Sequence, residues 1–164
     1  MSSDVGSALT PAEERALVVE LAGLVVGDVK PAELEVFDDT VEEYFEDTET
    51  ALRTSGRDES LGFGFEGLLL APYVLAVAGP VIRYLAGVVS EAAQAEVRPR
   101  LVALLRRLFR TVAPPSDDAP VTLSPGQIQH VRDLVVRTAG DIQLDETRTR
   151  LLADAVAGQL IATG

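Results

Sequence analysis

The sequence predicts an all-α fold: a bundle of amphipathic helices around a central apolar helix or kinked helical hairpin, followed by a C-terminal helical hairpin. Apolar residues make up 47% of the chain and aromatic residues only 5%, with no Trp and no Cys. The core must therefore consist mainly of Leu, Val and Ala, which favours helices. Apolar residues also recur with the helical period, and no segment alternates with period 2 for long enough to predict a strand.

The first predicted helix covers residues 11–27. Thr10 is its N-cap, Pro11 takes the first helical position, and the side chain of Glu13 can reach back to the N-cap amide, so these residues form a capping box. Leucines then recur at helical spacing as far as Gly27, which is suited to a C-terminal cap.

A second, strongly amphipathic helix is predicted over residues 31–53. Its apolar face falls within about a quarter of the helical wheel, and acidic side chains fill the opposite arc. The apolar face consists of Leu34, Phe37, Val41, Tyr44, Phe45, Thr48 and Leu52. An acidic row of this kind is ordinarily a solvated helix face, and its functional use would be to attract a basic partner. The candidate acidic interaction face consists of Asp39, Glu42, Glu43, Glu46 and Asp47.

An apolar central segment, residues 61–97, follows the acidic helix. Residues 67–89 within it carry a single charge, Arg83, and a helix of that length would span a bilayer core. A helix that is apolar on all sides is otherwise buried in protein. In that case Arg83 is a core charge that needs a carboxylate partner, which we expect from the helix over 31–53. Pro80 is expected to kink the helix.

A short basic amphipathic helix is predicted over residues 99–112. Its candidate membrane-binding or basic face consists of Arg100, Arg106, Arg107 and Arg110. We expect this face either to meet anionic lipid or to screen the acidic helix, within one protomer or across a dimer.

The C-terminal hairpin opens with a second capping box, in which Ser124 is the N-cap and Gln127 its partner. Asp145 can cap the second helix of the hairpin. The domain organisation predicted from these patterns has three parts: a helical bundle over residues 1–112, a Pro-rich linker over 113–123 and the helical hairpin over 124–164.

The stretch GFGFEG, residues 62–67, has the glycine spacing of a dinucleotide-binding loop. Such a loop needs a buried strand before its first glycine, and the preceding residues, SGRDESL, are too polar to form one. Glu66 would also place a carboxylate where the pyrophosphate must lie. We therefore expect a structural role for this stretch and no nucleotide binding.

No catalytic, cofactor-binding or metal-binding residue is predicted. The only histidine, His130, is expected to point toward water, and the chain offers it no cysteine, second histidine or G-x-S-x-G motif as a partner. The acidic helix lacks the glycine bend of a calcium loop, and no Glu-x-x-His motif is present for a di-iron bundle. The chain is therefore expected to be non-enzymatic and without cofactors.

The charge of the chain is concentrated near its N-terminus. The net charge is −12, and residues 1–60 alone carry sixteen acids and four bases, which equals that whole imbalance. An acidic chain repels phosphate backbones, so nucleic-acid binding is not expected. No secretory signal opens the sequence, so we expect a cytoplasmic protein, with peripheral attachment to the inner membrane or insertion in it as the alternative.

Two functions are compatible with these patterns. In the first, the chain is a small helical effector or anchor that meets a membrane through residues 67–89, helped by the adjacent basic helix. In the second, it is a soluble helical adaptor or self-associating interaction module, in which the acidic face or the C-terminal hairpin docks on a partner protein. A monodisperse, detergent-free preparation of the full chain would favour the second function.

Overall fold

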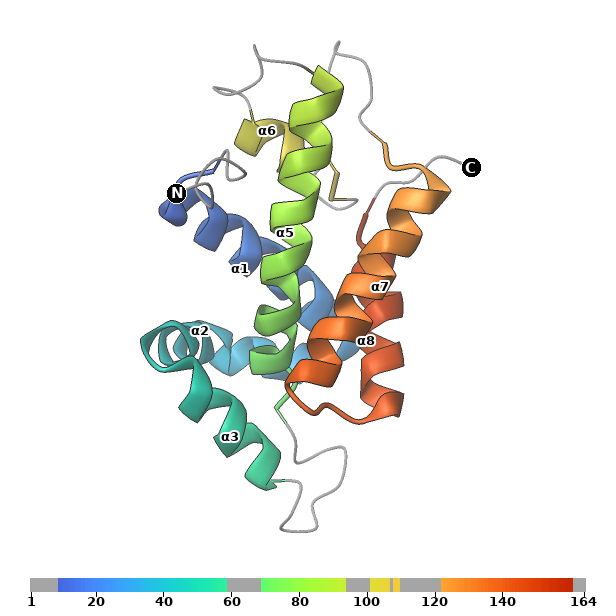
Figure 1. Cartoon of the computed structure of the whole chain (residues 1–164). Coiled ribbons are helices and arrows are strands. Elements are labelled where there is room, and N and C mark those ends of the chain that lie inside the picture. The colour runs from blue at the N-terminus through green and yellow to red at the C-terminus, as the bar shows by residue number, and fades with distance from the viewer. Residues whose placement is uncertain (1–8, 59–68, 94–100, 107, 110–121, 161–164) are drawn as a thin grey trace.

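The computed structural model describes residues 9–58, 69–93, 101–106, 108–109 and 122–160. These residues form an all-α bundle in which α5 (Ala71–Ala93) is the central helix (Figure 1). The surrounding elements are α1 (Pro11–Val29), the 3₁₀ helix η2 (Pro31–Val36), α2 (Phe37–Glu46), α3 (Thr48–Asp58), α6 (Leu101–Arg106), α7 (Pro125–Asp141) and α8 (Glu146–Gly158). Among the described residues there is no strand, and Phe109 and Leu160 form an isolated antiparallel bridge.

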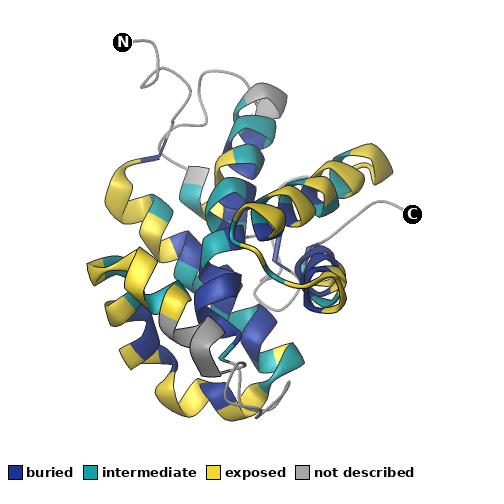
Figure 2. Ribbon diagram, turned by 60° about the horizontal axis from the view of Figure 1, so that its bottom comes forward, coloured by how far each residue is buried: buried dark blue, intermediate teal, exposed yellow. Residues whose placement is uncertain are grey.

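The central helix α5 is buried by its neighbours. It packs against α1, α2, α3, α6 and α7, and Figure 2 shows the buried residues turned toward the middle of the bundle. Val74, Ile82 and Leu85 are almost completely inaccessible to solvent. Each such aliphatic side chain contributes roughly 1.5–3 kcal/mol to folding on burial. The predicted apolar core helix is therefore confirmed.

The alternative of a kinked helical hairpin is wrong, because α5 runs through Pro80 as one continuous helix. Pro80 has no N–H to donate to the carbonyl of Ala76, four residues earlier. The loss is confined to one hydrogen bond, and the packing of neighbouring helices along the rest of α5 holds the helix together on both sides of the proline.

The capping box predicted for α1 is confirmed. The Thr10 hydroxyl accepts the N–H of Glu13 at 3.1 Å, and the N–H of Thr10 donates to the Glu13 carboxylate at 3.0 Å. The predicted end at Gly27 is wrong, because α1 continues to Val29 and the N–H of Lys30 donates to the carbonyl of Val26. The buried residues of α1 share one core with α5.

The single helix predicted over residues 31–53 is also wrong, because the chain forms η2, α2 and α3 in its place. Asp47 separates the last two, with an extended backbone at φ −152° and ψ 87°. Its carboxylate accepts the N–H of Thr50 at 3.2 Å and the hydroxyl of Thr50 at 2.7 Å. A side chain that satisfies these donors favours a new helix start over continuation. Leu34, expected on the buried face, lies on η2 and is 46% exposed.

The C-terminal hairpin consists of α7 and α8. Its two predicted caps are confirmed: Ser124 and Gln127 bond reciprocally, and the Asp145 carboxylate accepts the N–H of Arg148. The hairpin packs on the rest of the molecule, α7 against α5 and α8 against α1, and its buried residues belong to the same core cluster. Of the predicted linker over 113–123, only the last two residues are described, and the second of them, Leu123, is fully buried.

Candidate functional site

Two grooves of opposite charge lie beside α2. We name the first the acidic groove; it has a volume of about 490 Å³. Its walls come from α2, α3 and the start of α5, and it is lined by Thr40, Glu43, Glu46, Asp47, Thr50, Ala51, Leu69 and Pro72. The apolar lining residues Ala51, Leu69 and Pro72 are called the aliphatic floor, and the carboxylates of Glu43, Glu46 and Asp47 are called the rim. Together they form an amphipathic surface.

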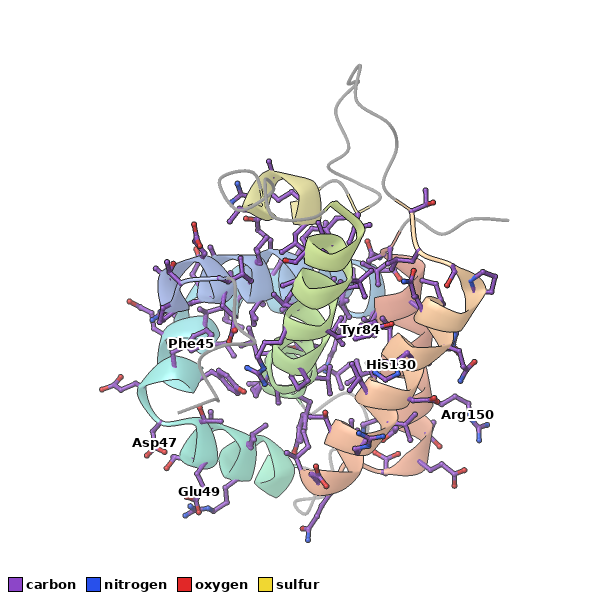
Figure 3. The ribbon with its side chains drawn as sticks, turned by 45° about the horizontal axis from the view of Figure 1, so that its top comes forward. Phe45, Asp47, Glu49, Tyr84, His130 and Arg150 are labelled. Atoms are coloured by element: carbon purple, nitrogen blue, oxygen red, sulfur yellow. The ribbon has the colours of Figure 1, made fainter. Side chains whose placement is uncertain are left out.

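The carboxylates of the acidic groove are of two kinds. Glu43 and Glu46 are exposed and form no ion pair with any described residue. Asp47 is engaged in capping α3, and the hydrogen bonds from Thr50 lower the pKa of its carboxyl below the ordinary 3.8. Figure 3 shows Asp47 on the outer side of the turn between α2 and α3. The groove therefore carries uncompensated negative charge.

The predicted acidic interaction face is divided by this geometry. Glu43, Glu46 and Asp47 line the groove. Asp39 and Glu42 are exposed on α2 and do not line it, and neither forms an ion pair within the described part of the chain. The face is thus an acidic surface with three of its carboxylates at a groove.

We name the second groove the cationic groove. It lies between α1, α2 and α5, has a volume of about 500 Å³, and is lined by Pro11, Glu14, Arg15, Val18, Tyr44, Phe45, Thr48, Leu75, Ala76, Gly79, Pro80 and Arg83. Two guanidinium groups and one carboxylate stand on its lining, so its charged side chains sum to +1.

The expectation that Arg83 is a buried core charge is wrong. Its side chain is 56% exposed, and its Nη1 donates to the Glu14 carboxylate on α1 at 3.0 Å. The expected partner from residues 31–53 is wrong as well. Arg83 occupies the side of α5 that faces the cationic groove, where the neighbouring helices leave the surface open to water. A guanidinium at such a position keeps its hydration, so it needs no buried counter-ion.

The other arginine of the cationic groove, Arg15, lies over an aromatic ring. Its guanidinium carbon is 4.3 Å from the centre of the Phe45 ring, which is the geometry of a cation–π contact. Tyr44 packs edge-to-face against Phe45, with ring centres 5.2 Å apart. Burial raises the pKa of the Tyr44 phenol above its ordinary value of 10, so the phenol is neutral near pH 7.

Of the four residues of the predicted basic face, Arg106 lies within the described part of the chain. Arg106 lies on α6, and its guanidinium donates to both carboxylate oxygens of Glu20 on α1, at 2.7 to 3.0 Å. Its charge is therefore matched inside the protein, although by α1 and not by the helix over 31–53 that we expected. Arg100, Arg107 and Arg110 lie outside the described residues.

One buried carboxylate with a structural role was not predicted from the sequence. Glu33 is 4% exposed, and it accepts the backbone N–H groups of Leu70 and Ala71 at the start of α5. Lys30 lies 3.4 Å from the same carboxylate. The only available signal was the absence of a Ser, Thr, Asp or Asn ahead of α5, which leaves the first N–H groups of that helix to be satisfied from elsewhere.

His130 is exposed, as predicted, and its ring also stacks on Tyr84 of α5 (Figure 3). The two ring centres are 4.2 Å apart, and the planes are tilted by 33°. The described residues include no group of three His, Cys, Asp or Glu side chains placed to hold a metal ion. The GFGFEG stretch lies outside the described residues, so its structural role stays a prediction.

No known protein family, curated protein or solved structure matches this chain. The chemistry of the two grooves therefore carries the functional inference.

Proposed function

We propose that the chain is a non-enzymatic helical interaction module whose acidic groove docks a basic segment of a partner protein. The observation that carries the proposal is the uncompensated charge of Glu43 and Glu46 beside an aliphatic floor. A segment with Lys or Arg next to apolar side chains matches both features. Aliphatic groups of the partner would cover the floor, and its cations would meet the carboxylates at the rim.

Electrostatics supports this choice of partner. Several basic side chains of the bundle have a carboxylate partner of their own, for example Arg83 with Glu14 and Arg106 with Glu20. The acids of α2 have none within the described residues. Together with the net charge of −12, this asymmetry attracts a basic segment and raises its rate of encounter. The Debye length is about 8 Å at physiological ionic strength, so binding should weaken as salt is added.

Membrane association is the second candidate function, and one specific observation favours it. The stretch Ala71–Ser90 of α5 is long and apolar enough to cross a bilayer by length and composition, with a mean hydropathy of 1.6. Insertion would require α5 to leave its contacts with α1, α2 and α7, and it would expose the apolar faces that these helices bury against it. We therefore propose that α5 stays in the bundle as its core helix.

A peptide titration tests the proposed docking. A synthetic helical peptide with one leucine face and one lysine face is titrated into the full chain by fluorescence anisotropy. The double substitution Glu43→Gln and Glu46→Gln should weaken binding about fivefold, because two exposed charge contacts together contribute about 1 kcal/mol.

A matched control makes the same change in charge elsewhere. Asp28 at the end of α1 and Asp141 at the end of α7 are exposed and form no ion pair with a described residue. The double variant Asp28→Asn and Asp141→Asn should bind the peptide as the wild type does. Equal weakening in the two double variants would show that only net charge matters, and the acidic groove would then not be the docking site.

A further inference from the structure

The cationic groove has the lining of a site for a small amphiphile. Its walls are largely apolar, with Val18 from α1, Phe45 from α2 and Leu75 from α5 on the lining. Its volume of about 500 Å³ falls in the range of small-molecule sites, roughly 300–1,000 Å³. An unbranched aliphatic chain needs no hydrogen-bond partners, so it can occupy such walls without leaving polar groups unsatisfied.

Because Gly79 has no side chain, the α5 side of this groove is open at that position. A Cβ atom placed there would lie 3.9 Å from the Arg83 guanidinium and would contact no side chain of another helix within 4 Å. The position can therefore accept a larger side chain without disturbing the core. Such a side chain would occupy groove volume instead.

The charged groups of the groove favour an anion. Arg83 uses one N–H, to Glu14, in its interactions with described residues. Arg15 contacts the Phe45 ring and has no carboxylate partner in the described part of the chain. Unused guanidinium donors at the edge of an aliphatic groove are suited to a carboxylate, which accepts charge-assisted hydrogen bonds.

We propose that the cationic groove binds a fatty-acid-type ligand, with the acyl chain along Val18, Leu75 and Gly79 and the carboxylate at Arg15 and Arg83. This site shares no lining residue with the acidic groove. The polarity of its lining also distinguishes it, because the acidic groove carries carboxylates and no base.

Glu14 allows a ligand-binding role of Arg83 to be distinguished from a structural one. Its carboxylate accepts one N–H at the edge of the Arg83 guanidinium and repels a second carboxylate nearby. A merely structural Arg83–Glu14 pair would lose the same contact whichever partner is changed. If Arg83 binds the ligand, the two substitutions have opposite effects on affinity. Arg83→Gln removes a donor for the ligand, and Glu14→Gln removes the carboxylate that competes with it.

Calorimetric titration of laurate into the full chain, below the concentration at which laurate forms micelles, tests the site. We expect saturable binding of laurate and none of methyl laurate, which has the same chain without the charge. The double substitution Arg15→Gln and Arg83→Gln should weaken laurate binding about tenfold, and Glu14→Gln should tighten it about twofold. Gly79→Leu should abolish binding by filling the groove.

The double variant Arg132→Gln and Arg150→Gln is the matched control, because these arginines also form ion pairs, with Asp154 and Glu146, and the change in net charge is the same. It should leave laurate affinity unchanged, and all variants should keep the wild-type helix content by circular dichroism. The proposal is overturned if the wild type does not bind laurate, if methyl laurate binds equally well, or if laurate affinity survives the loss of Arg15 and Arg83. Weaker binding in Glu14→Gln would equally overturn it.

Discussion

The carboxylate of Glu33 accepts the backbone N–H of Leu70, which lies 37 residues further along the chain, through both of its oxygens at 2.8 and 3.1 Å. One oxygen also accepts the N–H of Ala71 at 2.9 Å. The segment before α5, Leu68-Leu69-Leu70, offers no side chain that can cap a helix. The first N–H groups of the most apolar helix are therefore satisfied by a buried carboxylate of η2, whose charge also suits the positive end of the helix dipole.

Glu33→Ala is expected to destabilise the protein by about 1–3 kcal/mol, because it leaves buried N–H groups without an acceptor. Glu33→Gln should cost less, since the amide oxygen can still accept one of these hydrogen bonds. Chemical denaturation monitored by circular dichroism measures both changes. Glu35→Ala, an exposed neighbour on η2, is the control and should change stability by less than about 0.5 kcal/mol. A Glu33→Ala protein as stable as the Glu35→Ala control would show that the cap is dispensable.

Asp47 should make stability depend on pH at the acid end. Hydrogen bonds from the side chain and backbone of Thr50 lower the pKa of its carboxyl in the folded protein below 3.8. Its contribution is therefore present above the ordinary pKa and is lost as the pH falls through the lowered folded value. Asp47→Asn keeps a capping side chain but does not titrate, so its melting temperature should approach that of the wild type as the pH is lowered through this range. A constant difference from pH 7 to pH 2 would contradict this role.

The pair of Arg106 and Glu20 should couple α6 to α1. The two side chains are 43% and 32% exposed, so a double-mutant cycle with Arg106→Gln and Glu20→Gln should give a coupling energy of about 0.5–1 kcal/mol, the upper part of the range for exposed pairs. The bidentate geometry of the pair is the reason for expecting a coupling energy in this upper part of the range. The coupling should fall with added salt. If Arg106 instead faces lipid, Arg106→Gln will lower binding to anionic vesicles and the cycle will show no coupling.

Cleavage of the predicted linker should not release the C-terminal hairpin. A specific protease site inserted at Asp117 is expected to be cut in the native protein. The two fragments should still elute together in gel filtration, because α7 packs against α5 and α8 against α1 in one core. Fragments that separate without denaturant would show that the hairpin is an independent domain.

Local signals in the sequence were sufficient for much of the fold. The caps formed by Thr10, Ser124 and Asp145 each depend on residues within three positions, and all three were predicted correctly. The apolar run of α5 predicted a helix placed either in a protein core or in a membrane, and the packing around it in the bundle corresponds to the first alternative.

Features that depend on distant contacts were missed. In the sequence, Glu33 has the pattern of a surface acid, and only the position of α5 shows that it is a buried helix cap. Arg83 has the pattern of a core charge, and only the packing of the helices shows that its side of α5 is open to water. The break at Asp47 was within local reach, since an Asp followed three residues later by Thr50 can cap a helix, but the continuous amphipathic pattern across it predicted one helix. The acidic groove depends on this break, because its lining comes from both α2 and α3.

The central claim is that this apolar helix is the core of an interaction module. Hydrogen exchange of α5 in the presence of anionic vesicles tests that claim most directly. With the full chain, the amides at buried positions of α5, such as Val77, Ile82 and Leu85, should exchange slowly and at the same rate with and without vesicles. The protected amides of α1 and α7, which cover α5, should also be unchanged. Loss of protection in α1 and α7 on adding vesicles, with α5 still protected, would show that α5 leaves the bundle for the bilayer and would contradict the account.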